Sequence, residues 1–328
     1  TARDAGAAES GGAGDGGSAS DGATGPPDAA TVIGESVSES QAGDEAETGP
    51  AAADIGMPEL SQLDVEDLRA EAEGNPYEPD PWMQLGAAYA RKGRLPRAED
   101  AIRMAIKAGA RGADPQVWLA DIIARRGRID DAMATYRKAI AIAPNNGVAH
   151  NNLGNLLLEG GSIEDALKSY RAAQKAAPRD PVYAYNAGVA HTRLGQLSEA
   201  REAYETAVRL RKGFAAAWNN LGVVYGRLDL NEKMVKAFRR ALRSDKRYTP
   251  ARYNLALALV RLGRAEEAAE HLGDVLLTEP GNSEAHRLMG QALVMRGAPD
   301  EAIHHYQKAL VLSPEDAETR RLIGMAYA

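Results

Sequence analysis

The chain has 328 residues, of which 26% are charged and 5% are aromatic, and its formal net charge is −7. It contains no cysteine, which excludes disulfides, thiolate catalysis and zinc sites built from cysteine. No apolar run reaches the roughly 18 residues that a membrane-spanning helix requires, so we expect no transmembrane segment.

The charge is divided unevenly along the chain. Residues 1–78 carry 18 acidic and 2 basic side chains, a net charge of −16, whereas residues 79–328 carry a net charge of +9. The first part is therefore acidic and the second part basic. A basic surface favours partners that carry carboxylates or other anionic groups.

Residues 1–55 consist mostly of Gly, Ala, Ser, Asp and Glu with scattered Pro. Such a segment cannot bury enough apolar surface to offset the entropy lost on ordering, so we expect a disordered acidic linker. It is similar to the spacer that follows the lipidated cysteine of bacterial envelope lipoproteins, although that cysteine is not in this sequence. Two locations stay open: the bacterial periplasm or envelope, with a lipid anchor on a residue before Thr1, and the cytoplasm.

Residues 56–78 have a different composition. Leu60, Leu63 and Leu68 lie at helical spacing, and Gly74 and Pro76 follow them where a helix would end. The outward positions of this segment are acidic. We therefore expect an N-terminal capping helix that covers the first unit of the repeat array that follows.

A pattern with a period of 34 residues occupies residues 79–328. In one copy, Leu153 and Gly154 lie on the face of a first helix, and Ala166 and Tyr170 lie on the face of a second. The residues in phase with Gly154 are Gly86, Ala120, Gly188, Gly222, Ala256, Gly290 and Gly324. Full repeats start at residues 79, 113, 147, 181, 215, 249 and 283, and a half repeat starts at 317.

This pattern resembles the tetratricopeptide repeat (TPR). The first full repeat matches the motif of that family with Trp82, Leu85, Gly86, Tyr89 and Ala98. The resemblance implies an all-α fold, an α-solenoid of antiparallel helix pairs that winds into a right-handed superhelix. It also implies that the first helices of the repeats line a concave surface, and that the protein functions through protein–protein interaction.

The fifth repeat departs from the pattern. Asp229 replaces the glycine that follows the first helix, and Met234 replaces the alanine that lets the two helices approach closely. We therefore expect looser packing between these two helices. Residues 233–247 are also rich in Lys and Arg, which indicates a basic patch on the convex side.

No catalytic constellation is present in the sequence: it has no P-loop, no nucleophile elbow and no cysteine. His304 and His305 are adjacent and point to different sides of a helix, which does not suit a shared metal ion. We expect no enzymatic activity, no cofactor and no metal. One alternative stays open, namely that the chain is the regulatory region of an enzyme whose catalytic part follows residue 328.

Four asparagines recur at the sixth repeat position on the expected concave surface: Asn152, Asn186, Asn220 and Asn254. Asparagine is a middling helix former, so stability alone explains such a row poorly. An amide offers donors and an acceptor to an extended peptide backbone. The row is similar to the asparagine ladder of the O-GlcNAc transferase superhelix, although no catalytic domain of that family is present. The alternative is a common family variant with solvated amides.

Neighbouring positions supply further candidates for peptide binding. Asn151, Asn219, Tyr185 and Tyr253 occupy the fifth repeat position, and Trp118 occupies the sixth. The aromatic residues are candidate anchors for a ligand, with a role in packing as the alternative.

The thirteenth repeat position is mostly arginine. These residues are Arg91, Arg125, Arg193, Arg227 and Arg261. A row of positively charged side chains beside the asparagines favours an acidic partner. The alternative explanation is that arginine near a helix C-terminus is favourable because of the helix dipole.

From these observations we expect a non-enzymatic adaptor or assembly factor that binds an extended polypeptide, one with acidic residues, in the concave groove. The alternative is a structural scaffold that binds through the convex basic patch. Nucleic acid is not an expected partner.

Overall fold

The computed structural model describes residues 65–327, and within them it contains sixteen helices and no strand. The helices are α3 (Val65–Gly74), α4 (Pro79–Arg91), α5 (Leu95–Lys107), α6 (Asp114–Arg125), α7 (Ile129–Ile142), α8 (Gly147–Glu159), α9 (Ile163–Ala176), α10 (Pro181–Arg193), α11 (Leu197–Leu210), α12 (Ala215–Arg227), α13 (Asn231–Ser244), α14 (Thr249–Arg261), α15 (Ala265–Thr278), α16 (Ser283–Met295), α17 (Pro299–Leu312) and α18 (Ala317–Tyr327). The predicted all-α fold is confirmed.

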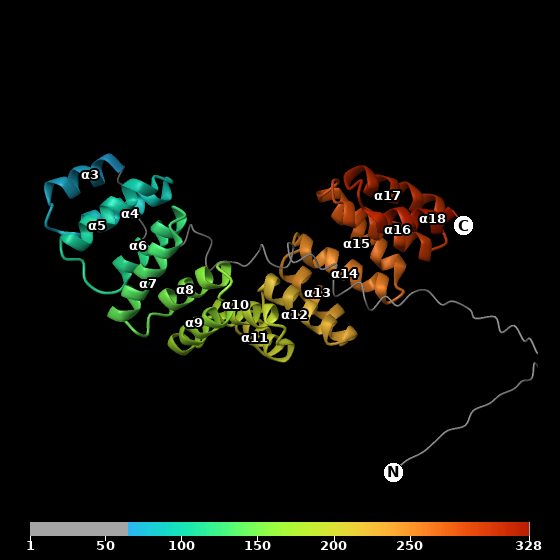
Figure 1. The fold of residues 1–328 in the computed structure, drawn as a ribbon, viewed down its shortest axis with the longest axis horizontal. Coiled ribbons are helices and arrows are strands. Elements are labelled where there is room, and N and C mark those ends of the chain that lie inside the picture. The colour runs from blue at the N-terminus through green and yellow to red at the C-terminus, as the bar shows by residue number, and fades with distance from the viewer. Residues whose placement is uncertain (1–64, 328) are drawn as a thin grey trace, which may run out of the picture. The chain divides into compact units, whose positions relative to one another are not determined.

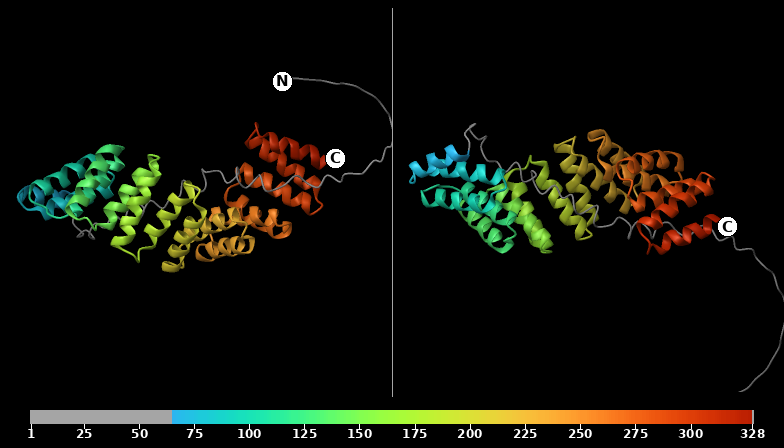
Figure 2. Two further views of the ribbon diagram at one scale, coloured as in Figure 1. Left: turned by 60° about the horizontal axis from the view of Figure 1, so that its bottom comes forward. Right: turned by 90° about the horizontal axis from the view of Figure 1, so that it is seen from above.

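The helices form consecutive pairs, from α4 with α5 to α16 with α17, and α18 follows the last pair (Figure 1). Each helix of a pair packs most extensively against its partner. The second helix of each pair then packs against the first helix of the next pair. The two further views show successive pairs lying side by side (Figure 2). Contacts therefore stay between neighbouring repeats, as in a solenoid.

Helix α3 lies inside the range predicted for the capping helix. Val65, Leu68 and Ala72 are buried, and α3 packs against α4. The linker predicted for residues 1–55 lies outside the described residues. Within the described part, none of the helices is long and apolar enough to cross a lipid bilayer.

The turn between the two helices of most repeats needs a residue with positive φ. Gly161 supplies it in the third repeat with a φ of 80°, and Asp229 supplies it in the fifth with a φ of 57°. Glycine reaches this region without a steric cost, and aspartate is among the side chains that tolerate it best. The replacement of glycine in the fifth repeat therefore keeps the same turn.

The first helix carries a small residue where the second helix approaches most closely. A Cβ atom on Gly154 would lie 2.7 Å from the ring of Tyr170, and one on Gly222 would lie 2.5 Å from the ring of Phe238. Both rings are buried. At Gly154, Gly188, Gly222 and Gly290 an aromatic ring of the second helix fills the space that a side chain would need, and at Gly86 the side chain of Ile102 does so.

The expectation of looser packing in the fifth repeat is wrong. Met234 is buried, and Gly226 lies opposite it, so that a Cβ atom at Gly226 would approach the Met234 sulfur to 2.8 Å. The larger residue on α13 is matched by the missing side chain on α12. Helices α12 and α13 accordingly pack as extensively as the pairs of other repeats.

An ion cluster around the buried carboxylate of Glu99 joins the first two repeats. Glu99 of α5 pairs with Arg103 at 2.7 Å, with Arg128 at 3.1 Å, and with Arg126. Burial alone would raise the pKa of Glu99, but the hydrogen bonds from Arg103 and Arg126 outweigh it and hold the pKa below its usual value. The carboxylate therefore stays charged and links α5 to the turn between α6 and α7.

Candidate functional site

The four asparagines of the sixth repeat position form a chain of hydrogen bonds between neighbouring first helices. Each one donates its side-chain amide to a residue of the preceding repeat: Asn152 to Asp121 at 3.0 Å, Asn186 to Asn151 at 2.8 Å and to Asn155 at 3.3 Å, Asn220 to Tyr185 at 3.2 Å, and Asn254 to Asn219 at 2.9 Å. Within single repeats, Asn151 donates to Asn152 and Asn219 donates to Asn220. We call this set of residues the asparagine spine.

The spine is only partly exposed. Asn186 and Asn220 are buried, with 2% and 9% exposure, so the expectation that all four amides lie on an exposed face is wrong for these two. The physical reason is that a buried amide must find a partner, and the adjacent first helix supplies one at short range. Asn152 and Asn254 are half-buried and keep hydrogen-bonding capacity toward solvent.

The three candidate aromatic anchors are all buried. Trp118 lies in the core formed by the first repeats. Tyr185 packs against Phe214, with 4.9 Å between the ring centres, and Tyr253 is buried with its hydroxyl 3.4 Å from Glu284. These residues support the packing of the first helices, and a ligand would need a rearrangement to contact their rings.

The arginines at the thirteenth position lie at the ends of the first helices. Arg125 donates to the carbonyl of Ala90 at 3.4 Å, and Arg193 donates to the carbonyl of Leu158 at 3.1 Å. Both acceptors belong to the last turn of the preceding first helix, where carbonyls lack partners within the helix. This arrangement provides part of the reason for arginine at the position.

The five arginines differ in exposure and partners. Arg261 instead pairs with Asp229 at 3.3 Å and is half-buried. Arg91, Arg125, Arg193 and Arg227 are exposed. The guanidinium groups of Arg193 and Arg227 can therefore meet a ligand on the face of the first helices, whereas Arg261 already has a carboxylate as its partner.

A second feature was not predicted from the sequence. The side chain at the fourth repeat position hydrogen-bonds to the carbonyl six residues before it, at the turn between repeats. This occurs in Trp82 with Pro76, His150 with Pro144, Trp218 with Lys212, Arg252 with Lys246, His286 with Pro280 and Arg320 with Pro314. The shared signal is a donor at this position, which takes three chemical forms and is hard to recognise as one motif.

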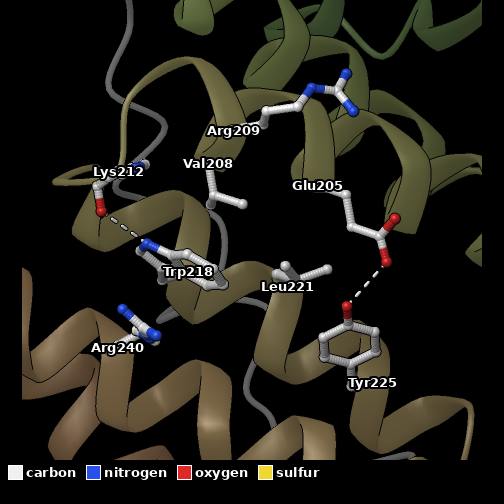
Figure 3. Close-up of a pocket in the computed structure, with 8 residues that line it drawn as sticks. All are labelled: Glu205, Val208, Arg209, Lys212, Trp218, Leu221, Tyr225 and Arg240. Carbon is white, nitrogen blue, oxygen red and sulfur yellow. Dashed lines mark hydrogen bonds between the residues drawn. The ribbon is translucent and has the colours of Figure 1, made fainter.

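One pocket lies at the junction of the fourth and fifth repeats, with a volume of about 430 Å³ (Figure 3). Helices α11, α12 and α13 form its walls. Its lining residues are Glu205, Val208, Arg209, Lys212, Trp218, Leu221, Tyr225 and Arg240. Trp218 and Asn220 are two residues apart on α12, so they point about 200° apart, and the pocket lies on the side of α12 away from the asparagine spine.

The fold and the repeated contacts define a tetratricopeptide repeat solenoid, a class of scaffold that supports protein–protein interaction and is typically non-catalytic. Residues 100–322 match the family model described as the cilia and flagella-associated protein 70 C-terminal domain, a TPR family. Because this match covers more than half of the chain, the chain belongs to that family. No curated protein matches the chain.

Solved structures show the same fold. A chain of a structure described as the APC/C hetero-tetramer Cut9–Hcn1 aligns with a TM-score of 0.58 at 19% identity, covering 80% of this chain and 52% of that one. PilF of Pseudomonas aeruginosa aligns with a TM-score of 0.57 at 20% identity, covering 65% and 96%. YrrB, described as a TPR protein with an unusual peptide-binding site, aligns with a TM-score of 0.51 at 22% identity, covering 57% and 96%.

Proposed function

We propose that the protein is a non-enzymatic adaptor or assembly factor that binds an extended polypeptide segment along the face of its first helices. The observation that carries this proposal is the pair of half-buried amides, Asn152 and Asn254. Each uses one N–H within the spine and has a second N–H for a ligand backbone.

The exposed arginines beside the spine support a ligand with carboxylates. Arg193 and Arg227 occupy the same position in successive repeats, and neither forms an ion pair with a carboxylate of residues 65–327. An arginine can hold a carboxylate through two parallel hydrogen bonds. YrrB shares the fold and is described as having a peptide-binding site, which adds support for a peptide as the ligand.

The test begins with a random peptide library selected against the full chain. The affinity of the selected peptides is then measured for the double variant Arg193→Glu with Arg227→Glu. The matched control is Arg137→Glu with Arg171→Glu, two exposed arginines that also lie at one repeat position in successive repeats, on the second helices α7 and α9.

We expect the first double variant to weaken binding by about tenfold or more and the control to change it by less than about threefold. The variant Asn152→Ala with Asn254→Ala is expected to weaken the same peptides, because a hydrogen bond contributes roughly 0.5–1.5 kcal/mol. Equal losses in the arginine variant and its control would contradict the proposal, as would selected peptides that bind independently of both amides.

A further inference from the structure

The fifth repeat is bordered by two lysines where other repeats have proline. Lys212 and Lys246 occupy the position that holds the closing proline in other repeats, namely Pro144, Pro178, Pro280 and Pro314. Proline suits this turn because it cannot continue the preceding helix. The lysine at position 212 adds positive charge at the pocket, and neither lysine improves the turn.

The floor of the pocket is apolar. Val208 and Leu221 are buried side chains, and Trp218 and Tyr225 present their rings beside them (Figure 3). The polar atoms of both rings are already occupied, since the Trp218 indole N–H donates to the Lys212 carbonyl at 2.9 Å and the Tyr225 hydroxyl donates to Glu205 at 2.8 Å. The half-buried ring of Trp218 is therefore the carbon surface that a ligand can reach directly, with the buried Val208, Leu221 and Tyr225 packed behind it.

The rim of the pocket is positively charged. Arg209, Lys212 and Arg240 line it, and none of them forms an ion pair with a carboxylate in the described part of the chain. Glu205 is the one acidic residue among the lining residues, and it accepts the Tyr225 hydroxyl at the opposite end from Lys212 and Arg240 (Figure 3). The end near Trp218 is therefore left with uncompensated positive charge.

We propose that this pocket binds an acidic peptide segment of a partner protein, which inserts one large apolar side chain. The side chain would lie against the half-buried Trp218 ring, and carboxylates beside it in the peptide would pair with Lys212 and Arg240. A pocket of about 430 Å³ is within the range of roughly 300–1,000 Å³ that ligand sites occupy. The positive charge of the rim favours an acidic peptide. The apolar floor favours a peptide that also carries a large apolar side chain over a polyanion that has none.

This site does not depend on the function proposed for the first helices, because it lies on the other side of α12 and uses none of the spine residues. The two proposals can fail separately. Binding at the pocket would let the protein hold two partner segments at once.

The experiment measures the binding of a fluorescein-labelled peptide, Asp-Glu-Asp-Phe-Glu-Asp, to the full chain by fluorescence anisotropy. The test variant is Lys212→Glu with Arg240→Glu. The control is Lys246→Glu with Arg243→Glu, which makes the same change in net charge at exposed residues one repeat or one helical turn away that do not line the pocket. All four residues are exposed, so we expect unchanged circular dichroism.

We expect the test variant to weaken binding by about tenfold or more and the control by less than about threefold. A peptide with glycine in place of phenylalanine is expected to bind about tenfold more weakly or worse, because the apolar contact is lost. Equal losses in the two double variants, or equal binding of the phenylalanine and glycine peptides, would show general attraction between charges and overturn the proposal. The absence of saturable peptide binding at both low and high salt would also overturn the proposal. This outcome includes the case in which the chain's own acidic residues occupy the pocket and exclude the peptide.

Discussion

Asn152 of α8 donates its side-chain amide to Asp121 of α6, with 3.0 Å between Nδ2 and Oδ1. The same carboxylate oxygen accepts the hydroxyl of Tyr136, which lies on α7. Asp121 therefore joins three helices of two repeats while its charge is buried. Burial raises the pKa of Asp121 to about 6, although the hydrogen bonds from Tyr136 and Asn152 act in the opposite direction.

The change Asp121→Asn is expected to stabilise the protein at pH 7 by roughly 1–3 kcal/mol. Between the usual aspartate pKa and about 6, the folded chain binds more protons at Asp121 than the unfolded chain does, so folding stability falls as pH rises through this window. Asparagine keeps an oxygen that accepts both hydrogen bonds and carries no charge. Urea unfolding at pH 7 and at about pH 4 measures the effect.

The gain for Asp121→Asn should be much smaller at about pH 4, where Asp121 itself is mostly protonated in the folded chain. The control Asp130→Asn changes an exposed carboxylate on α7 and should stay within about 0.5 kcal/mol of the wild type. A variant at Asp121 that is less stable than the wild type at pH 7 would show that the ionised carboxylate contributes net stability.

The asparagine spine is expected to contribute to stability at its buried members. Replacing Asn186 by Ala removes the donor to Asn151 and leaves that buried oxygen without this partner, at a cost of roughly 1–3 kcal/mol. Asn145→Ala, at an exposed turn, is the control and should change stability by less than about 0.5 kcal/mol. The stability of both variants is measured by the midpoint of urea unfolding and by hydrogen exchange in α8 and α10. Equal stability of the two variants would show that the buried hydrogen bond contributes nothing.

The repeat pattern predicted the helix pairs because its signals are local. A glycine that adopts positive φ, such as Gly161, and a small residue that faces a ring, such as Gly154, each reflect a constraint within one repeat. The spine is different, because the partner of Asn186 is Asn151 in the preceding repeat, 35 residues earlier. The sequence did contain a signal, since two repeats carry asparagine at both the fifth and the sixth positions.

The pocket could not be predicted because it depends on the sizes of side chains on three helices. Met234 stood out in the sequence as a departure from the pattern, but it does not indicate an open space by itself. Met234 led us to expect looser packing because the sequence does not show that Gly226 lies opposite it and leaves room for the larger side chain. Departures from an internal repeat therefore identify which repeat is specialised. The three-dimensional arrangement is needed to show what the specialised residues do.

Gly154→Ala is expected to destabilise the third repeat by roughly 1–3 kcal/mol, because the new Cβ atom would lie 2.7 Å from the Tyr170 ring. Gly273→Ala on α15 is the matched control, because no heavy atom lies within 4 Å of the position of its Cβ atom. Alanine is the better helix former, so this control should stabilise the protein by roughly 0.5–1 kcal/mol. Urea unfolding measures the change in the free energy of unfolding for both variants, and changes of opposite sign would agree with the structure. A stabilising Gly154→Ala would contradict the close approach of α8 and α9.

Two histidines of the seventh repeat form a pair between its two helices. His286 of α16 and His305 of α17 face each other, with 3.0 Å between their Nδ1 atoms, so one ring must donate to the other and both cannot be protonated without losing this contact. Burial, followed by the positive charge of His286, Lys308 and His304, lowers the pKa of His305 to about 4.

Because the folded pKa of His305 lies below the usual value, its contribution to stability is present above about pH 6.5 and is lost as pH falls toward 4. We expect α16 and α17 to lose roughly 1–3 kcal/mol of protection from hydrogen exchange between pH 7 and about pH 4. His305→Gln cannot be protonated and should remove most of this loss, whereas His304→Gln, at an exposed position, should keep it. The same pH dependence in all three proteins would assign the loss to other groups and rule out the histidine pair as its cause.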